Sequence, residues 1–217
     1  MSGKTALLFG GTGLVGQALH QLLDSDDDWE KIYFFSRRDL AVASAKTEIV
    51  VVDFDAIPAD TLRGDAIFCC IGTTIKKAGS EEAFRQIDHH IPLEIGRIGK
   101  KNQVPQYLLV SANGADSESW FFYNRVKGDL EKDLQALDFQ DLKILRPGLL
   151  LGDREEYRMG ESMAQVVMNA FAPILPSSYK PISAQTVAQA MWQLSSQAPQ
   201  ASSQQIWSNT ELLELGK

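Results

Sequence analysis

The stretch that decides the fold lies near the amino terminus, where residues 5–16 read TALLFGGTGLVG. Its first part, Thr5–Phe9, is a short apolar run of the kind that forms a buried strand. After the glycines, apolar residues recur at helical spacing from Leu14 to Leu23. The pattern therefore predicts a strand, a tight glycine turn and a helix.

The glycines of this turn, Gly10, Gly13 and Gly16, are spaced three residues apart. A pyrophosphate at a helix N-terminus is stabilised by unpaired backbone N–H groups and the helix dipole, provided that no side chain blocks its approach. The alternative is that the glycines serve only a tight turn and close packing. We expect a nucleotide here, bound by Gly10, Thr12, Gly13, Leu14, Val15 and Gly16.

Further short apolar runs follow along the chain, at Ile32–Phe35, Ile49–Val52, Ala66–Ile71, Tyr107–Val110 and Leu142–Leu145. Helical patterns separate them, over 81–101 with Ser80 as N-cap and a kink or break at Pro92, over 119–137, and over a short segment at 41–47. Because the apolar runs do not alternate with polar residues, they suit parallel strands covered on both faces. The sequence predicts an α/β, doubly wound parallel sheet of the Rossmann type, with strand order 3-2-1-4-5-6 and a ligand crevice at the carboxyl ends of the strands.

The character of the chain changes after Arg146-Pro147-Gly148. A charged stretch at 153–158 is followed by helical patterns near 162–171 and 184–194. Because 217 residues suit one domain, we expect a single Rossmann-type domain over 1–217, with residues 149–217 contributing a small cap on the substrate side.

Composition excludes several classes of protein. With 21 basic and 28 acidic residues the net charge is −7, so the electrostatic footprint of a nucleic-acid or anionic-membrane partner is missing. The only cysteines, Cys69 and Cys70, are adjacent and should point to opposite faces of a strand as reduced thiols. No secretory signal pattern and no run of about 20 apolar residues is visible, so we expect a cytoplasmic location.

The residues after the second and third strands bear on which nucleotide binds. An arginine at the end of the second strand can pair with the 2′-phosphate of NADP, and this chain has Ser36-Arg37-Arg38 there. Asp53 and Phe54, after the third strand, are candidates to flank the adenine. The alternatives are two surface arginines and a loop-capping aspartate. We expect NADP(H) as the cofactor.

A candidate catalytic set follows the fifth predicted strand. Tyr123 and Lys127 are four residues apart in a predicted helix, so their side chains can share one face. A lysine cation favours the phenolate of a nearby tyrosine, which suits a general acid or base. Ser111, at the end of the strand, could donate a hydrogen bond to a substrate carbonyl. These three roles describe a hydride-transfer site.

The chain resembles the atypical short-chain dehydrogenase/reductases, in particular the Tat-interacting-protein-like oxidoreductases and their bacterial relatives. The resemblance is carried by the glycine turn and four further segments: residues 69–79, 111–116, 123–131 and 146–154. It implies NADP(H) binding, with Gly72 and Thr73 near the cofactor and Pro147-Gly148 beside the nicotinamide. It also implies Ser111, Tyr123 and Lys127 as the catalytic set, although Ala112 stands where a second serine would be expected.

The other conspicuous residues give weaker indications of function. His89 and His90 are helix neighbours without partners at metal-ligand spacing, so we expect no metal site. Glu131 could pair with Lys127, but a solvated surface position is the default. Trp120 and the two phenylalanines after it could line a pocket or a subunit interface, or simply pack in the core.

The sequence thus favours an NADP(H)-dependent oxidoreductase that reduces a small carbonyl compound, with Tyr123 as the proton donor. A second possibility is an NADPH-binding regulatory protein that controls contact with a protein partner, or a homodimer, without significant turnover. A sugar-nucleotide epimerase or dehydratase is disfavoured because its substrate needs a larger cap.

Overall fold

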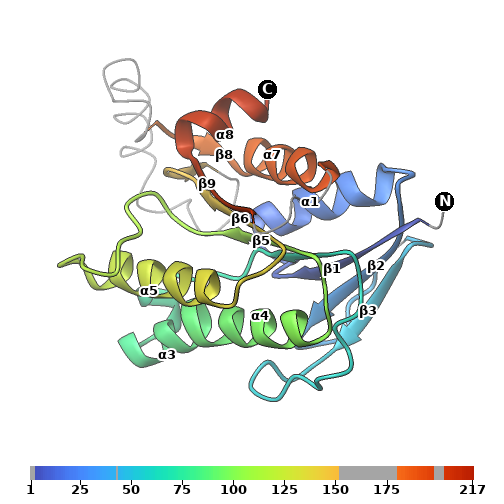
Figure 1. Cartoon of the computed structure of the whole chain (residues 1–217), viewed down its shortest axis with the longest axis horizontal. Coiled ribbons are helices and arrows are strands. Elements are labelled where there is room, and N and C mark those ends of the chain that lie inside the picture. Colours follow the sequence, from blue (N-terminus) through green and yellow to red (C-terminus); the bar gives the residue numbers. More distant parts are fainter. Residues whose placement is uncertain (1–2, 43, 152–179, 198–202) are drawn as a thin grey trace.

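The centre of the protein is a sheet of seven strands in the order β3-β2-β1-β4-β5-β6-β9, with every neighbouring pair parallel (Figure 1). The computed structural model describes residues 3–42, 44–151, 180–197 and 203–217. The strands are β1 (Lys4–Phe9), β2 (Trp29–Ser36), β3 (Thr47–Val51), β4 (Ala66–Cys69), β5 (Gln106–Val110), β6 (Asp141–Arg146) and β9 (Ser203–Ser208). A separate parallel pair is formed by β7 (Leu150–Leu151) and β8 (Ile182–Ser183).

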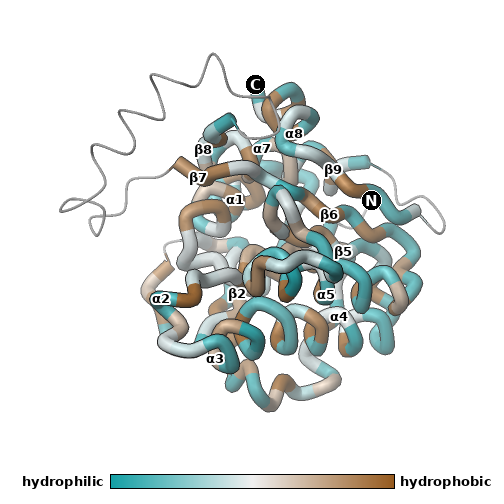
Figure 2. The backbone as a smooth tube through the Cα atoms, turned by 90° about the vertical axis from the view of Figure 1, so that its left-hand side faces the viewer, coloured by the Kyte–Doolittle hydropathy of each residue, from teal (hydrophilic) through white to brown (hydrophobic). Residues whose placement is uncertain are grey.

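Helices cover both faces of this sheet (Figure 1). On one face lie α1 (Leu14–Ser25), α7 (Ala184–Ser196) and α8 (Asn209–Leu215). On the other lie α3 (Glu81–Arg85), the π-helical turn η1 (Gln86–His90), α4 (Ile91–Lys101) and α5 (Phe122–Ala136), with the short α2 (Ile75–Ala78) before them. Figure 2 shows the alternation of hydrophilic and hydrophobic residues along α4 and α5 that gives each an apolar side toward the sheet.

Two apolar cores result, one on each side of the sheet. Neighbouring strand residues divide between them: Leu8 packs with α1 and α7, whereas Leu7 packs with α4 and α5. The inner strands are therefore buried on both faces, which explains their continuous apolar runs. Cys69 and Cys70 divide in the same way and are free thiols, as predicted.

The predicted fold class and strand order are confirmed, and the structure adds β9 beyond β6. The described part of the segment 149–217 also contributes to the body of the fold, since β9 forms an edge of the sheet and α7 packs against α1. The charged stretch at 153–158 and the predicted helix near 162–171 lie outside the described residues.

One helix prediction needs correction. Residues 41–42 and 44–46 are not helical, because Ser44 Oγ accepts the N–H of Lys46 at 3.1 Å in a local bond that competes with a helix. The irregularity expected at Pro92 is present as the π turn η1, which interrupts the α-helix just before the proline. Pro92 then takes one of the first two positions of α4, where its missing N–H costs little.

The N-cap at Ser80 is confirmed, since its hydroxyl accepts the N–H of Ala83 at 3.1 Å. None of the helices in the described part of the chain is both long and apolar enough to cross a bilayer.

Candidate active site

The glycine turn joins β1 to α1 and leaves room that side chains would fill. Gly10 has φ +75°, and a Cβ there would lie 2.5 Å from the backbone of Cys70. A Cβ on Gly16 would lie 2.3 Å from the carbonyl oxygen of Gly10. Gly13, the N-cap of α1, has no side-chain cap, and the first turn of the helix carries no acidic residue. A bare helix N-terminus of this kind suits a pyrophosphate.

Side chains contribute little to this turn. Thr12 is exposed, Leu14 is half-buried, and Val15 is buried in the core beside α7. Leu14 and Val15 can therefore serve a ligand only through their backbone N–H groups, as at any helix start.

Five predicted residues share the carboxyl ends of the adjacent strands β2 and β3: Ser36, Arg37, Arg38, Asp53 and Phe54. Ser36 is buried, and its hydroxyl accepts the N–H of Arg38 at 3.3 Å, which fixes the start of the loop. Arg37, Arg38 and Asp53 are exposed, whereas Phe54 packs against Phe9 with 6.2 Å between ring centroids. Two guanidinium groups thus lie at the edge where an adenosine ribose would bind in this fold.

The segment after β4 is tied to the helical layer by a buried carboxylate. Asp88, on η1, accepts the N–H of Thr73 at 2.9 Å and is fully buried. A Cβ on Gly72 would lie 3.4 Å from the other oxygen of this carboxylate. That oxygen is 2.7 Å from the ammonium of Lys127, a close charge pair without the alignment of a hydrogen bond. Asp88 therefore links the Gly72-Thr73 segment to α5.

Lys127 is the charged residue at the centre of the site, and only 3% of its side chain is exposed. Burial by itself lowers the pKa of a lysine, but the negative charge of Asp88, reinforced by Tyr123, outweighs it, and the pKa of Lys127 is raised. Tyr123 lies one turn earlier on α5, half-buried, with its ring 5.4 Å from that of Phe84. The helix thus holds a permanent cation within electrostatic reach of a phenol.

Ser111, just after β5, has a partner that the sequence did not suggest. Its hydroxyl donates to Glu131 on α5, and the Arg146 guanidinium at the end of β6 binds both oxygens of the same carboxylate, with Nε 3.1 Å from each. Glu131 is only 3% exposed. Our expectation of a solvated Glu131 was wrong, because its partners come from two strands and not from its own helix.

Pro147 and Gly148 follow β6 and are enclosed by later parts of the chain. The carbonyl of Pro147 accepts the N–H of Asn113 at 2.8 Å, and the N–H of Gly148 donates to Asn209 at 2.7 Å. A Cβ on Gly148 would lie 2.7 Å from the carbonyl oxygen of Lys180, so only glycine fits.

The sequence-predicted residues therefore lie along the carboxyl edge of the sheet, in loops and on α1 and α5. The structure adds Asp88, Glu131 and Arg146, which sequence reasoning did not assign to the site. Arg146 directly precedes Pro147-Gly148, and this position in the motif was the one feature of the sequence that could have assigned it to the site. No feature of the sequence pointed to Asp88, because its partner Lys127 is on another helix.

Of the aromatic residues before Tyr123, Phe122 is half-buried with its ring 5.9 Å from that of the buried Phe84, whereas Trp120 and Phe121 do not pack in the core. Trp120 is 97% exposed and Phe121 74% exposed. Nor do the residues that the structure describes include a group of three metal-ligating side chains.

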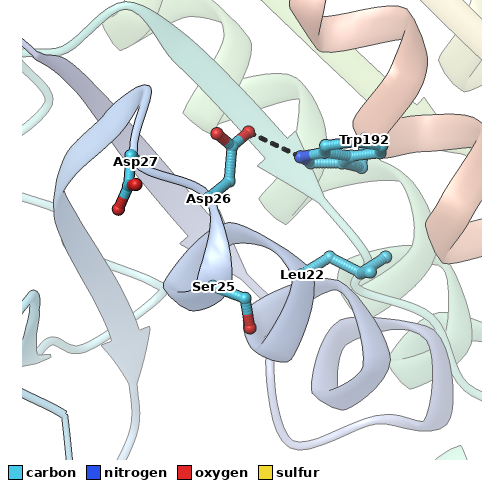
Figure 3. Close-up of a pocket in the computed structure, with 5 residues that line it drawn as sticks. All are labelled: Leu22, Ser25, Asp26, Asp27 and Trp192. Atoms are coloured by element: carbon cyan, nitrogen blue, oxygen red, sulfur yellow. Dashed lines mark hydrogen bonds between the residues drawn. The ribbon is translucent and has the colours of Figure 1, made fainter.

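A hollow in the described part of the surface lies at the opposite end of α1, away from these residues. It measures about 400 Å³ and is lined by Leu22, Ser25, Asp26, Asp27 and Trp192 (Figure 3). Trp192 Nε1 donates to Asp26 at 2.8 Å across it. This hollow is wide open, and its one polar contact joins two of its own walls, so it has no bearing on the chemistry at the carboxyl edge.

Comparison with known proteins places the chain in a family. Protein HTATIP2 from Rattus norvegicus is 31% identical over 223 residues, covering 100% of this chain and 91% of the relative. The chain belongs to the HTATIP2 and FMP52 family of atypical short-chain dehydrogenase/reductases. Protein FMP52 from Candida glabrata is 37% identical over 164 residues, covering 74% of this chain and 70% of the relative. No protein-family model matches the chain.

Solved structures share the fold at low sequence identity. MoeE5, solved in complex with UDP-glucuronic acid and NAD, has a TM-score of 0.72 at 12% identity, covering 95% of this chain and 76% of its own. The oxidoreductase ylbE from Lactococcus lactis has a TM-score of 0.68 at 18% identity, covering 97% of this chain and 95% of its own. The chain therefore has the NAD(P)-binding Rossmann fold of oxidoreductases and epimerases.

One expectation is overturned by the relatives. Several FMP52 proteins carry a mitochondrial name, which contradicts the cytoplasmic location we expected. The reasoning failed because the missing secretory signal separates exported proteins from the rest, and does not separate cytoplasm from an organelle.

Proposed function

We propose that the chain is a single-domain, NADP(H)-dependent oxidoreductase that reduces a small carbonyl compound with Ser111, Tyr123 and Lys127. The observation that carries the proposal is the buried ammonium of Lys127, held 2.7 Å from Asp88 and one helical turn from Tyr123. Burying a lysine in its charged form costs desolvation free energy, and such a charge is often found at functional sites. The residue within the electric field of this charge is a tyrosine.

The residues present fit a dinucleotide. The bare N-terminus of α1 and the absence of side chains at Gly10 and Gly16 suit the pyrophosphate. Arg37 and Arg38 suit a 2′-phosphate, which is the basis for preferring NADP(H) to NAD(H). Gly72, Thr73, Pro147 and Gly148 would face the nicotinamide end. When bound, the reduced cofactor supplies a hydride to the carbonyl carbon.

The protein's own residues account for the proton. Tyr123 donates its phenolic proton to the carbonyl oxygen as that oxygen gains charge. The Lys127 ammonium stabilises the phenolate left behind, and it would also hold the nicotinamide ribose. Ser111 orients the substrate from the end of β5.

Two measurements test this function. Thermal unfolding with NADPH, NADH or no nucleotide should show a larger shift with NADPH, since a ligand at 100 times its Kd stabilises by about 2.7 kcal/mol. Tyr123→Phe should abolish NADPH oxidation with a panel of small ketones and aldehydes while leaving the thermal shift intact. Equal shifts with both nucleotides would remove the role of Arg37, and turnover unaffected by Tyr123→Phe would remove the proposed acid.

A second candidate function is favoured by the exposure of Trp120 and Phe121 directly before the proposed catalytic helix. In it, bound NADPH controls a contact with a protein partner or a second copy of the chain. Sedimentation with and without NADPH distinguishes the two functions: nucleotide-dependent self-association that Trp120→Ala abolishes, with no turnover, would support regulation in place of catalysis.

A further inference from the structure

The ammonium of Lys127 is held by a carboxylate that comes from another element of the helical layer. Asp88, on η1, is fully buried, and its Oδ1 lies 2.7 Å from Lys127 Nζ. The second oxygen of the same carboxylate accepts the N–H of Thr73 at 2.9 Å, so Asp88 is itself held by the segment after β4. Among the described residues, Asp88 is the one acidic side chain paired with Lys127. The position of the ammonium therefore depends on this carboxylate.

Most of the hydrogen-bonding capacity of Lys127 is not used by the protein. An ammonium carries three N–H groups, and Oδ1 of Asp88 can accept one of them at most. In the part of the chain that the structure describes, no hydrogen bond joins Lys127 to any other residue. At least two donors of a side chain that is 3% exposed therefore have no acceptor there. Because buried donors in native proteins are nearly always satisfied, these N–H groups are available to a ligand with acceptor oxygens.

The ion pair borders the segment that we expect to lie near the cofactor. A Cβ built on Gly72 would lie 3.4 Å from Asp88 Oδ1 and 3.8 Å from Lys127 Nζ. Because glycine has no Cβ, residue 72 places no side chain against the ammonium. Two N–H donors on one nitrogen match two neighbouring hydroxyl groups, and the ribose next to the nicotinamide ring carries such a pair.

We propose that Asp88 is a positioning residue that aims the remaining N–H groups of Lys127 at the hydroxyls of the nicotinamide ribose, acting through the lysine and not by contact with the cofactor. This inference rests on the proposed function. A lysine has a flexible four-carbon stem, so burial alone does not fix its ammonium. Asp88 supplies the fixed point, because Thr73 engages one of its oxygens and Lys127 the other.

Two ligands, of which only one contains the nicotinamide ribose, test the inference. NADPH has this ribose, whereas adenosine 2′,5′-bisphosphate keeps the adenosine half with its 2′-phosphate and lacks it. The dissociation constants of both are measured by isothermal titration calorimetry at pH 7. Asp88→Asn should weaken NADPH binding about tenfold or more, the effect of one charge-assisted hydrogen bond, and should change bisphosphate binding by less than about twofold. A merely structural role of Asp88 would weaken the binding of both ligands alike.

Variants assign the effect to Lys127. In Asp88→Asn the side-chain oxygen can still accept the Thr73 N–H, while the NH2 group faces the ammonium and displaces it. Lys127→Met should weaken NADPH binding to a similar extent. The double variant Asp88→Asn/Lys127→Met should bind NADPH no more weakly than Lys127→Met does, because Asp88 acts through the lysine. Asp129→Asn is the matched control on the same helix as Lys127, since Asp129 pairs with Arg85 at 3.0 Å, and it should keep the wild-type ratio of the two affinities.

The outcomes separate this inference from the function on which it rests. If the wild type oxidises NADPH with a ketone but Asp88→Asn keeps the ratio of the two affinities, the inference fails alone. The same holds if the double variant binds NADPH more weakly than Lys127→Met. If neither nucleotide binds to the wild type, the proposed function and the inference fail together. Should Asp88→Asn not fold, Asp88→Glu decides, because it keeps the charge and moves the oxygens by one methylene group; a wild-type ratio in this variant would overturn the inference.

Discussion

Replacing Asp88 with asparagine tests the charge pair at the centre of the site. The substitution keeps the shape and an acceptor for the Thr73 N–H, and replaces the charged oxygen that faces Lys127 by a neutral NH2 group. At an effective dielectric constant of about 20, two unit charges 2.7 Å apart attract by about 6 kcal/mol. Removing one partner of a buried pair typically costs about 3–5 kcal/mol.

Lys127 can limit this cost by giving up its proton, and the limit depends on pH. A lysine has an ordinary pKa of 10.5. Leaving it neutral in the folded state therefore costs at most about 4.8 kcal/mol at pH 7 and about 1.4 kcal/mol at pH 9.5, at 1.36 kcal/mol per unit. We expect Asp88→Asn to lose about 3–5 kcal/mol of unfolding free energy at pH 7, and no more than about 1.4 kcal/mol at pH 9.5.

The direction in which the stability difference changes with pH follows from proton linkage. In the wild type the pKa of Lys127 is raised, so its stabilisation is complete below pH 10.5 and is lost only as pH rises through the higher folded value. In the variant the folded pKa falls below 10.5, the unfolded chain binds more protons, and stability relative to wild type increases with pH. The wild type must therefore serve as the reference at each pH.

Urea unfolding of both proteins at pH 7 and pH 9.5, followed by tryptophan fluorescence and circular dichroism, measures the two differences. Asp129→Asn is the matched control, since Asp129 pairs at 3.0 Å with the partly exposed Arg85, which stays charged at both pH values. Its loss should be below about 1 kcal/mol and independent of pH. A deficit for Asp88→Asn that is equally large at pH 9.5, or below about 1 kcal/mol at pH 7, would refute the reasoning.

Three further predictions concern the turn, the opposite end of the sheet and the surface. Gly16→Ala should abolish the NADPH-induced thermal shift, because the new Cβ would lie 2.3 Å from the backbone oxygen of Gly10; an unchanged shift would place the nucleotide elsewhere. Lys143→Ala should cost about 3–5 kcal/mol in urea unfolding, because it leaves the buried carboxylate of Asp141, 2.5 Å away, without its cation; a loss under 1 kcal/mol would contradict this. Trp120→Ala, at a side chain 97% exposed, should change the unfolding free energy by less than about 0.5 kcal/mol in the same assay.

The sequence predicted six strands and their order because each carries an apolar run, largely buried in the inner strands and half-buried to exposed in the edge strand β3. The seventh strand, β9, reads SQQIWS and has alternating half-buried and exposed residues. An edge strand with one covered face and two glutamines has no apolar run to detect. Its pairing with β6 depends on β6 already being in place, which is information that a local pattern lacks.

The site residues that the sequence suggested depend on local spacing, whereas those it missed depend on contacts between different helices and strands. Tyr123 and Lys127 share a helix, so their spacing alone predicts that they are neighbours. Asp88 and Lys127 are on different helices, and their contact depends on the π turn η1, which places Asp88 against α5. Glu131 was misread for the same reason, since the residues that bury it lie on the ends of β5 and β6.

The two buried carboxylates, Asp88 and Glu131, each pair with a cation and hold a second polar group beside the proposed site. Asp88 lies 2.7 Å from Lys127 and accepts the N–H of Thr73, so a displacement of the segment after β4 would be felt at the ammonium that serves Tyr123. Glu131 accepts from Arg146 and from the hydroxyl of Ser111, so it fixes the serine while its own charge is paired. Both pairs depend on α5, because Lys127 and Glu131 lie on this helix. A change in the register of α5 by one residue would therefore break both pairs together, which makes α5 the element on which the proposed roles of Tyr123 and Ser111 jointly depend.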